Sequence, residues 1–219
     1  LTTDWEKIVS KNELSYILGN PPFVGARLME KEQKENFLEL FDNIKGAGNL
    51  DYVTAWYEKA SRYIQGTKIK TAFVSTNSIC QGEQVGILWK RLKEKYNIII
   101  HFAHQTFKWS NDAPGMAAVY CIIVGFACFD SPKKYLYEYE TIKSEPKEKE
   151  VKHINAYLVE GEDIFIESRT DSICDVPEIG IGNKPIDGGY YLFSKEEKEE
   201  FIKKEPGSEK YFKKWIGGE

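Results

Sequence analysis

Short apolar runs alternate with amphipathic stretches along the first hundred residues. Three runs have the length and composition of buried strands: residues 14–18, 70–75 and 97–103. Three other stretches repeat their apolar positions with helical spacing: residues 31–41, 52–60 and 83–95. Asn49 or Asp51 is suited to cap the second of these helices. Strands that alternate with helices predict an α/β fold with a parallel sheet.

The pattern changes after the third strand. A fourth apolar run, 117–126, follows it directly, which predicts an antiparallel hairpin at the edge of the sheet. Residues 133–152 are dense in charge and carry alternating tyrosines, typical of an exposed strand and a solvated turn. Residues 153–166 suggest a strand and a loop. Further on, Ser194 and Glu197 form a capping box for a helix over 195–204.

Composition narrows the class of protein only slightly. The chain has 219 residues, 42% hydrophobic, with a net charge of −4. It therefore lacks the basic excess of a self-sufficient nucleic-acid binder, and any phosphate contact must come from local lysines. No apolar run reaches the roughly 18 residues of a membrane span, and the start does not resemble a signal peptide. The cysteines and histidines lack metal-ligand spacing, so we expect a cytoplasmic protein with no metal site and no membrane contact.

The first apolar run ends at Gly19 and is followed by Asn20-Pro21-Pro22-Phe23. Each proline fixes its own φ and restricts the residue before it, so the segment is stiff. The Asn20 side-chain oxygen and the Pro21 carbonyl then form two fixed acceptors beyond a strand end, suited to a planar NH2 group. Phe23 offers a ring for stacking a base. A rigid turn with no further role would explain the same four residues.

Longer stretches carry a family resemblance. The segment ILGNPPF resembles motif IV of amino-methyltransferases, which use S-adenosylmethionine, and its Asn form is typical of adenine-N6 enzymes. The wider chain resembles the MmeI-like proteins, single-chain restriction–modification enzymes with nuclease, methyltransferase and target-recognition regions. That resemblance lies in GNPPFVGARLMEKEQK, GAGNLDYVTAWYEKA, AFVSTNSICQGEQVGILW and HFAHQTFKWSNDAPGMAAVYCIIVGF. The stretch NKPIDGGYYLFSKEEKEEFIKKEPGSEKYFKKWIGG resembles the segment that leads into target recognition.

The resemblance implies catalytic roles for the four motif residues. Asn20 and the Pro21 carbonyl would hold the adenine amine, Pro22 would keep the turn rigid, and Phe23 would stack on the flipped base. Such an enzyme must take its target base out of the DNA stack.

Four further residues have implied roles, each with a simpler alternative. Asp51 and Tyr52 fall in a region that closes over the cofactor, or they are a helix cap and a core aromatic. Asn77 would line the pocket, or it is only a polar loop residue. Phe107 would be a second aromatic against the target base, with Trp109 as its rival, or it packs in a loop.

The resemblance also implies a fold class and a division of the chain. We expect the C-terminal half of a Rossmann-like class I methyltransferase sheet over residues 1–130, with the first strands missing, and a mixed connector over 131–219. No glycine-rich cofactor loop follows a strand, so we expect an internal fragment that is inactive alone. Its partners would be DNA and the remainder of the parent chain. The strand before Asn20 would be an exposed edge that drives self-association.

Two other functions remain open from the sequence. A side-chain amide or an RNA base also presents an NH2 group, so the motif would suit a methyltransferase of protein glutamine or of RNA. The chain could also be a non-catalytic DNA-binding or assembly module that has the fold of a methyltransferase but not its activity. The net charge of −4 favours this alternative.

Overall fold

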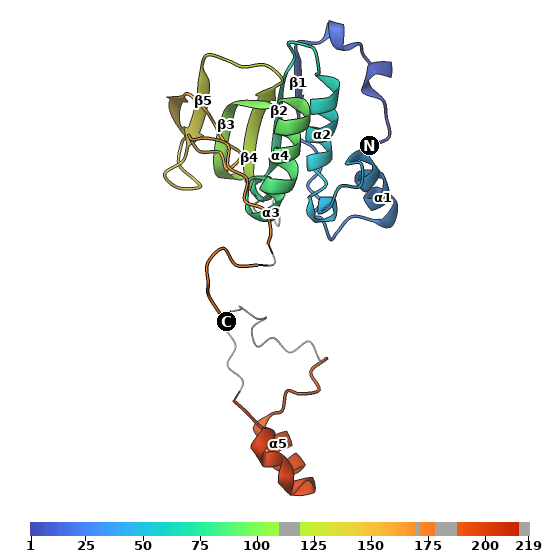
Figure 1. The fold of residues 1–219 in the computed structure, drawn as a ribbon, viewed down its shortest axis with the longest axis vertical. Coiled ribbons are helices and arrows are strands. Elements are labelled where there is room, and N and C mark those ends of the chain that lie inside the picture. Colours follow the sequence, from blue (N-terminus) through green and yellow to red (C-terminus); the bar gives the residue numbers. More distant parts are fainter. Residues whose placement is uncertain (110–118, 170, 178–187, 215–219) are drawn as a thin grey trace. The chain divides into compact units, whose positions relative to one another are not determined.

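The computed structural model describes residues 1–109, 119–169, 171–177 and 188–214 (Figure 1). Two compact units divide the chain, Leu1–Ser168 and Arg169–Glu219.

The first unit is built on a six-stranded sheet with the order β1-β2-β4-β3-β5-β6. Its strands are β1 (Tyr16–Gly19), β2 (Lys70–Thr76), β3 (Ile99–Trp109), β4 (Val119–Ala127), β5 (Lys134–Glu138) and β6 (Lys147–Val151). β1 pairs with β2 in parallel, and so does β3 with β5. β4 runs antiparallel to both β2 and β3, and β6 runs antiparallel to β5. The α/β class predicted from the alternating pattern is therefore confirmed, but the sheet is mixed and not purely parallel.

The helices beside this sheet are α1 (Lys31–Leu40), α2 (Thr54–Tyr63) and a continuous helical stretch made of α3 (Gly82–Gln84), the π-helical turn η5 (Val85–Trp89) and α4 (Lys90–Tyr96). α2 and α4 lie over one face of the sheet, and α1 packs against α2 (Figure 1). Short 3-10 turns lie at η1 (Trp5–Lys7), η2 (Lys11–Glu13), η3 (Ala47–Asn49) and η4 (Asn77–Cys80). All three predicted helices are confirmed, and the π turn interrupts the third.

Aromatic packing joins α2 to the sheet. Tyr57 of α2 is fully buried, and its ring is stacked on that of Phe126 in β4 at 5.4 Å. The same ring meets Phe73 of β2 edge-on at 5.3 Å. The Tyr57 hydroxyl shares a 2.7 Å hydrogen bond with the Ser75 hydroxyl, which satisfies both groups in the core.

A buried charge network joins α2 to α4. Glu58 is fully buried, and Arg91 donates to its two carboxylate oxygens at 3.0 and 2.9 Å. The Tyr96 hydroxyl donates to the same carboxylate at 2.6 Å. Arg91 and Lys95 also pair with Asp42, just beyond α1. Because an unpaired buried carboxylate is costly, these partners fix the relative positions of the helices.

Two expectations drawn from the pattern of apolar runs were wrong. The run at 14–18 suggested a buried strand, but β1 is an edge strand whose Tyr16 and Leu18 are 63% and 75% exposed, which confirms the exposed edge that the family resemblance implied. The β3–β4 hairpin is antiparallel as predicted, but it is not at the edge. β4 inserts between β2 and β3, and β5 and β6 extend the sheet beyond β3. Apolar runs do not encode strand order, which explains both errors.

The sheet face opposite α2 and α4 carries aromatic side chains. The pairing register places Phe102, His104 and Phe107 of β3 on this face, together with Tyr137 of β5. Gly125 of β4 faces the same way, and a Cβ there would lie 2.0 Å from the Phe102 ring. The glycine therefore makes room for that ring to lie across the neighbouring strand.

The second unit contains α5 (Lys195–Lys204) and the 3-10 turn η6 (Pro206–Tyr211). The predicted capping box is confirmed, since Ser194 N–H donates to Glu197 at 2.7 Å and Glu197 N–H donates to the Ser194 hydroxyl at 3.2 Å. A small cluster of T-shaped ring contacts holds α5 against its flanks and consists of Phe193, Phe201 and Phe212.

Candidate functional site

The parallel strands end at one edge of the sheet. β1, β2, β3 and β5 run in the same direction, so their carboxyl ends lie together. Asn20 follows β1, Asn77 follows β2, and Phe107 lies near the end of β3. In open α/β sheets, ligands bind outside the carboxyl ends of the strands. The fold therefore brings three separate sequence predictions to the edge where a substrate is expected.

The Asn-Pro-Pro-Phe segment presents a polar group outward and an aromatic group inward. Asn20 is exposed, and its side chain makes no hydrogen bond to another residue that the structure describes. Pro21 is buried, Pro22 is exposed, and Phe23 is half-buried against the core. Gly19 packs closely on Phe73, since a Cβ at Gly19 would lie 3.2 Å from two carbons of that ring. The packed glycine and Pro21 anchor the turn, and the Asn20 amide stays available.

Asp51 connects the predicted site segments. One carboxylate oxygen accepts from Ala26 N–H at 3.0 Å, and the other accepts from the Ser78 hydroxyl. Asp51 N–H donates to the Gln84 side chain at 3.1 Å. The loop after Phe23, the turn η4 that follows β2 and the last residue of α3 therefore meet at one residue. The expectation that Asp51 caps α2 with its side chain was wrong, because the carboxylate turns to these partners instead.

Tyr52 has a similar internal role. Its N–H donates to the Val24 carbonyl at 2.9 Å, which ties it to the loop after the motif. Its ring contacts Trp56 edge-on at 5.2 Å and Phe37 at 6.2 Å. Asp51 and Tyr52 are thus engaged within the protein, and they fit the positioning of a loop better than direct contact with a cofactor.

Asn77 lines a cavity at the strand ends. Its side-chain NH2 donates to the Thr106 hydroxyl of β3 at 3.4 Å, across the end of β4. The cavity has a volume of about 470 Å³. It is lined by Asn77, Cys80, Gln81, Gln105, Thr106, Ile122, Tyr139, Tyr157 and Leu158. Amides, a hydroxyl and two phenol rings give it the mixed lining of a pocket for a planar polar group.

The sequence had suggested that the third strand ends at residue 103, before Phe107. In the structure, Phe107 lies within β3. Its ring is 6.2 Å from the ring of its rival Trp109, which is 40% exposed, and the register places both on the same face. Phe107 is also stacked with Tyr139, with centroids 5.6 Å apart. Tyr139 also lines the cavity beside Asn77 but was not among the residues predicted from the sequence, although it is the last of the alternating tyrosines at 135, 137 and 139.

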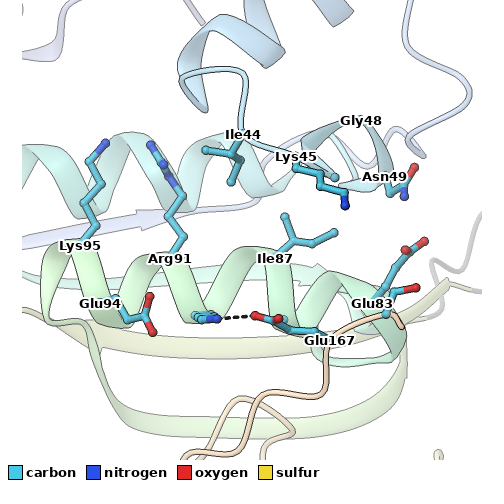
Figure 2. A pocket seen from close by; sticks show the side chains of 14 residues that line it. Ile44, Lys45, Gly48, Asn49, Glu83, Ile87, Arg91, Glu94, Lys95 and Glu167 are labelled. Carbon is cyan, nitrogen blue, oxygen red and sulfur yellow. Dashed lines mark hydrogen bonds and ion pairs between the residues drawn. The ribbon is translucent and has the colours of Figure 1, made fainter. Parts of the chain in front are cut away.

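A larger cavity, of about 930 Å³, lies elsewhere (Figure 2). It opens between residues 44–49 and the α3–η5–α4 helix, with Ile44 and Ile87 facing across it and an ion pair of Lys90 with Glu167 at its border. None of the site residues predicted from the sequence lines this cavity. The candidate site is therefore the strand-end edge and not the larger space.

The site has little charge of its own. Burial lowers the pKa of His104, so its imidazole is neutral at neutral pH. In the part of the chain that the structure describes, no three His, Cys, Asp or Glu side chains gather as metal ligands. None of the described helices has the length and apolarity to cross a bilayer.

Comparisons with known proteins agree with this geometry. Residues 1–138 match the family described as "MmeI, DNA-methyltransferase domain", and residues 160–219 match "MmeI, target recognition domain". DNA methyltransferase A of Bacillus subtilis (strain 168) is 42% identical over 220 residues, which cover 99% of this chain and 24% of that protein. The structure of the Type IIL restriction-modification enzyme MmeI in complex with DNA matches with a TM-score of 0.89 and 48% identity. That match covers 99% of this chain and 29% of the other.

An α/β sheet with Asn-Pro-Pro-Phe beyond a parallel strand, matched over residues 1–138, defines a protein of the methyltransferase class. The chain belongs to the MmeI family of DNA methyltransferases. It spans about a quarter of the length of the curated relative that it matches.

Proposed function

We propose that the full-length protein methylates the N6 amine of adenine within a specific DNA sequence, as part of a restriction–modification system. The observation that carries this proposal is the Asn20 amide, exposed and without a hydrogen bond to any described residue, at the carboxyl end of β1. S-adenosylmethionine is the proposed donor: its methyl group would pass from the positively charged sulfur to N6, S-adenosylhomocysteine would leave as a neutral thioether, and N6 would lose one proton.

Asn20 and the Pro21 carbonyl would accept the two hydrogens of the adenine amine. That amine is a poor nucleophile because its lone pair is delocalised into the ring. Two fixed acceptors stabilise the positive charge that develops on nitrogen as it attacks, and they need no rearrangement during the reaction. The rigid turn at Pro21 and Pro22 gives the acceptors their fixed direction.

Phe23 and Phe107 would hold the flipped base from two sides. The strand order places β2 and β4 between the strands that carry these residues. Three inter-strand steps correspond to roughly 14 Å between strand axes. A base held by both rings would therefore lie across the ends of β2 and β4, next to Asn77. Phe23 is only partly buried against the core, so the exposed part of its ring would be available to the base.

The remainder of the full-length chain would provide most of the cofactor site. Asp51 and Tyr52 are engaged in internal contacts, so the described residues would line only one side of the cofactor site. The edge strand β1 has a free side on which further parallel strands could pair, consistent with a sheet that lacks its first strands here. We therefore propose that these 219 residues do not methylate on their own.

DNA is the proposed partner in the cytoplasm. The match of residues 160–219 to a target recognition domain supports this proposal. The net charge of −4 implies that most of the phosphate contacts come from local lysines or from the rest of the protein.

Substitution of Asn20 tests this function in the full-length protein. Asn20→Ala should lower kcat for DNA methylation by about 100-fold or more, the loss typical of a missing transition-state hydrogen-bond partner. DNA affinity should change little. Asn12→Ala, at another exposed asparagine near the start of the chain, is the matched control and should leave kcat unchanged. An active Asn20→Ala enzyme would refute the assigned role.

A further inference from the structure

Tyr139 contacts both the predicted stacking residue and the strand-end cavity. Its ring is stacked with Phe107, with centroids 5.6 Å apart and planes 24° from parallel. It also lines the cavity of about 470 Å³ beside Asn77 and Thr106. Tyr139, which follows β5, is therefore stacked on the Phe107 ring that is expected to contact the base.

A bulge in β3 makes this arrangement possible. His104 is opposite Ile123 of β4, and Phe107 is opposite Cys121, so β3 advances three residues where β4 advances two. In a regular strand, residues three apart face opposite sides of the sheet. The extra residue of the bulge brings His104 and Phe107 to the same face.

His104 in turn anchors Tyr139. The His104 Nδ1 and the Tyr139 hydroxyl share a hydrogen bond of 2.8 Å. The imidazole lies flat on the ring of Tyr137, with centroids 4.2 Å apart and planes 5° from parallel. Lys108 N–H donates to the Ile142 carbonyl at 2.9 Å, which ties the segment after β5 to β3 beside Phe107. Tyr139 is thus held at its hydroxyl and through its backbone segment.

We propose that Tyr139 is a positioning residue that fixes the orientation of Phe107 against the flipped base. This inference rests on the proposed function. Tyr139 backs the Phe107 ring, and its anchored hydroxyl prevents it from turning away. Without this support, Phe107 gains rotational freedom that it must lose again each time a base stacks on it.

A double-mutant cycle in the full-length protein tests this role. Tyr139→Leu should lower kcat/KM for DNA methylation by about 3- to 10-fold, the range expected for one aromatic pair. In a Phe107→Ala background, the same substitution should lower kcat/KM by less than about two-fold, because the ring that it supports is gone. Tyr139→Phe keeps the ring but loses the hydrogen bond to His104, so its kcat/KM should lie between those of the wild type and Tyr139→Leu.

Tyr135→Leu is the matched control. Tyr135 lies on β5, four residues before Tyr139 and opposite Phe102, without a ring contact to Phe107 among the described residues. Any loss that it causes should be equal in both backgrounds. If Tyr139→Leu does not fold, Tyr139→Met fills most of the same volume and enters the same cycle.

The results separate the two proposals. An equal loss from the Tyr139 substitution in both backgrounds, or no loss in either, overturns the positioning role while adenine methylation by the wild-type protein stands. A wild-type protein that does not methylate adenine overturns the proposed function, and the role of Tyr139 with it.

Discussion

Removal of the Asp51 carboxylate should loosen the loop that follows the Asn-Pro-Pro-Phe segment. The carboxylate holds Ala26 N–H at 3.0 Å and the Ser78 hydroxyl, so it fastens this loop to the turn η4 that follows β2. Asp51→Ala removes both acceptor atoms at once. Asp51→Asn keeps one oxygen for Ala26 but loses the charge.

The structure sets the size of the effect. A hydrogen bond to a charged acceptor contributes about 1.5–3 kcal/mol. Asp51 is only half-buried, so water replaces part of each bond, and the lower end of that range applies. Opening of the loop at Ala26 breaks only the bond from Ala26 N–H to Asp51, so the relevant loss is about 1.5 kcal/mol, which corresponds to about ten-fold easier local opening. For Asp51→Asn, the loss should be about three-fold, since a neutral acceptor remains.

Hydrogen exchange of the full-length protein measures this opening. Peptides that contain Ala26 should exchange about ten-fold faster in Asp51→Ala than in the wild type, because exchange follows local opening. Peptides from β4 should be unchanged and are the internal control. The rate of DNA methylation should also be lower in Asp51→Asn than in the wild type, and lower still in Asp51→Ala. Unchanged exchange around Ala26 in Asp51→Ala would refute the reasoning that this carboxylate fastens the loop.

Three further predictions concern stability and association. Glu58→Ala should lower the unfolding free energy of the 219-residue chain by about 3 kcal/mol in urea titrations, since Arg91 and Tyr96 lose their buried partner and Arg91 keeps only the exposed Asp42; the exposed control Glu94→Ala should change it by less than about 0.5 kcal/mol. Hydrogen bonds from its lysine and arginine partners lower the pKa of Asp42 to about 2, so its stabilising effect is present above pH 4 and is lost as the pH falls towards 2. Asp42→Asn should therefore flatten acid unfolding in that window, and an unchanged acid curve would contradict this. The exposed β1 edge should make the 219-residue chain self-associate in light scattering, and Leu18→Lys should reduce the measured mass; a monomeric wild-type chain would exclude this contact.

Local patterns predicted most of the helices and strands of this fold. The capping box at Ser194 and the helical spacing of residues 83–95 depend on neighbours in the sequence, and both were confirmed. Strand order depends on contacts between distant residues, so the insertion of β4 was not predicted. The predicted end of the third strand at Ala103 was also too early. The polar residues after it hide a bulge that carries the strand on to Trp109.

In the candidate site, too, features set by neighbouring residues were predicted, and features set by distant contacts were not. The position of Asn20 beyond a strand followed from glycine and proline chemistry alone. The role of Asp51 did not, because its partners Ala26 and Ser78 lie 25 and 27 residues away along the chain. Tyr139 was missed for the same reason, since its contact with Phe107 exists only because β5 pairs with β3.

The labelled nucleoside tests the central claim most directly. The full-length protein is incubated with tritiated S-adenosylmethionine and DNA, and the DNA is then digested to nucleosides and separated. We predict label in N6-methyladenine, and its loss in the Asn20→Ala variant. Label in a methylated cytosine, or in a protein or RNA fraction with none in DNA, would contradict the account.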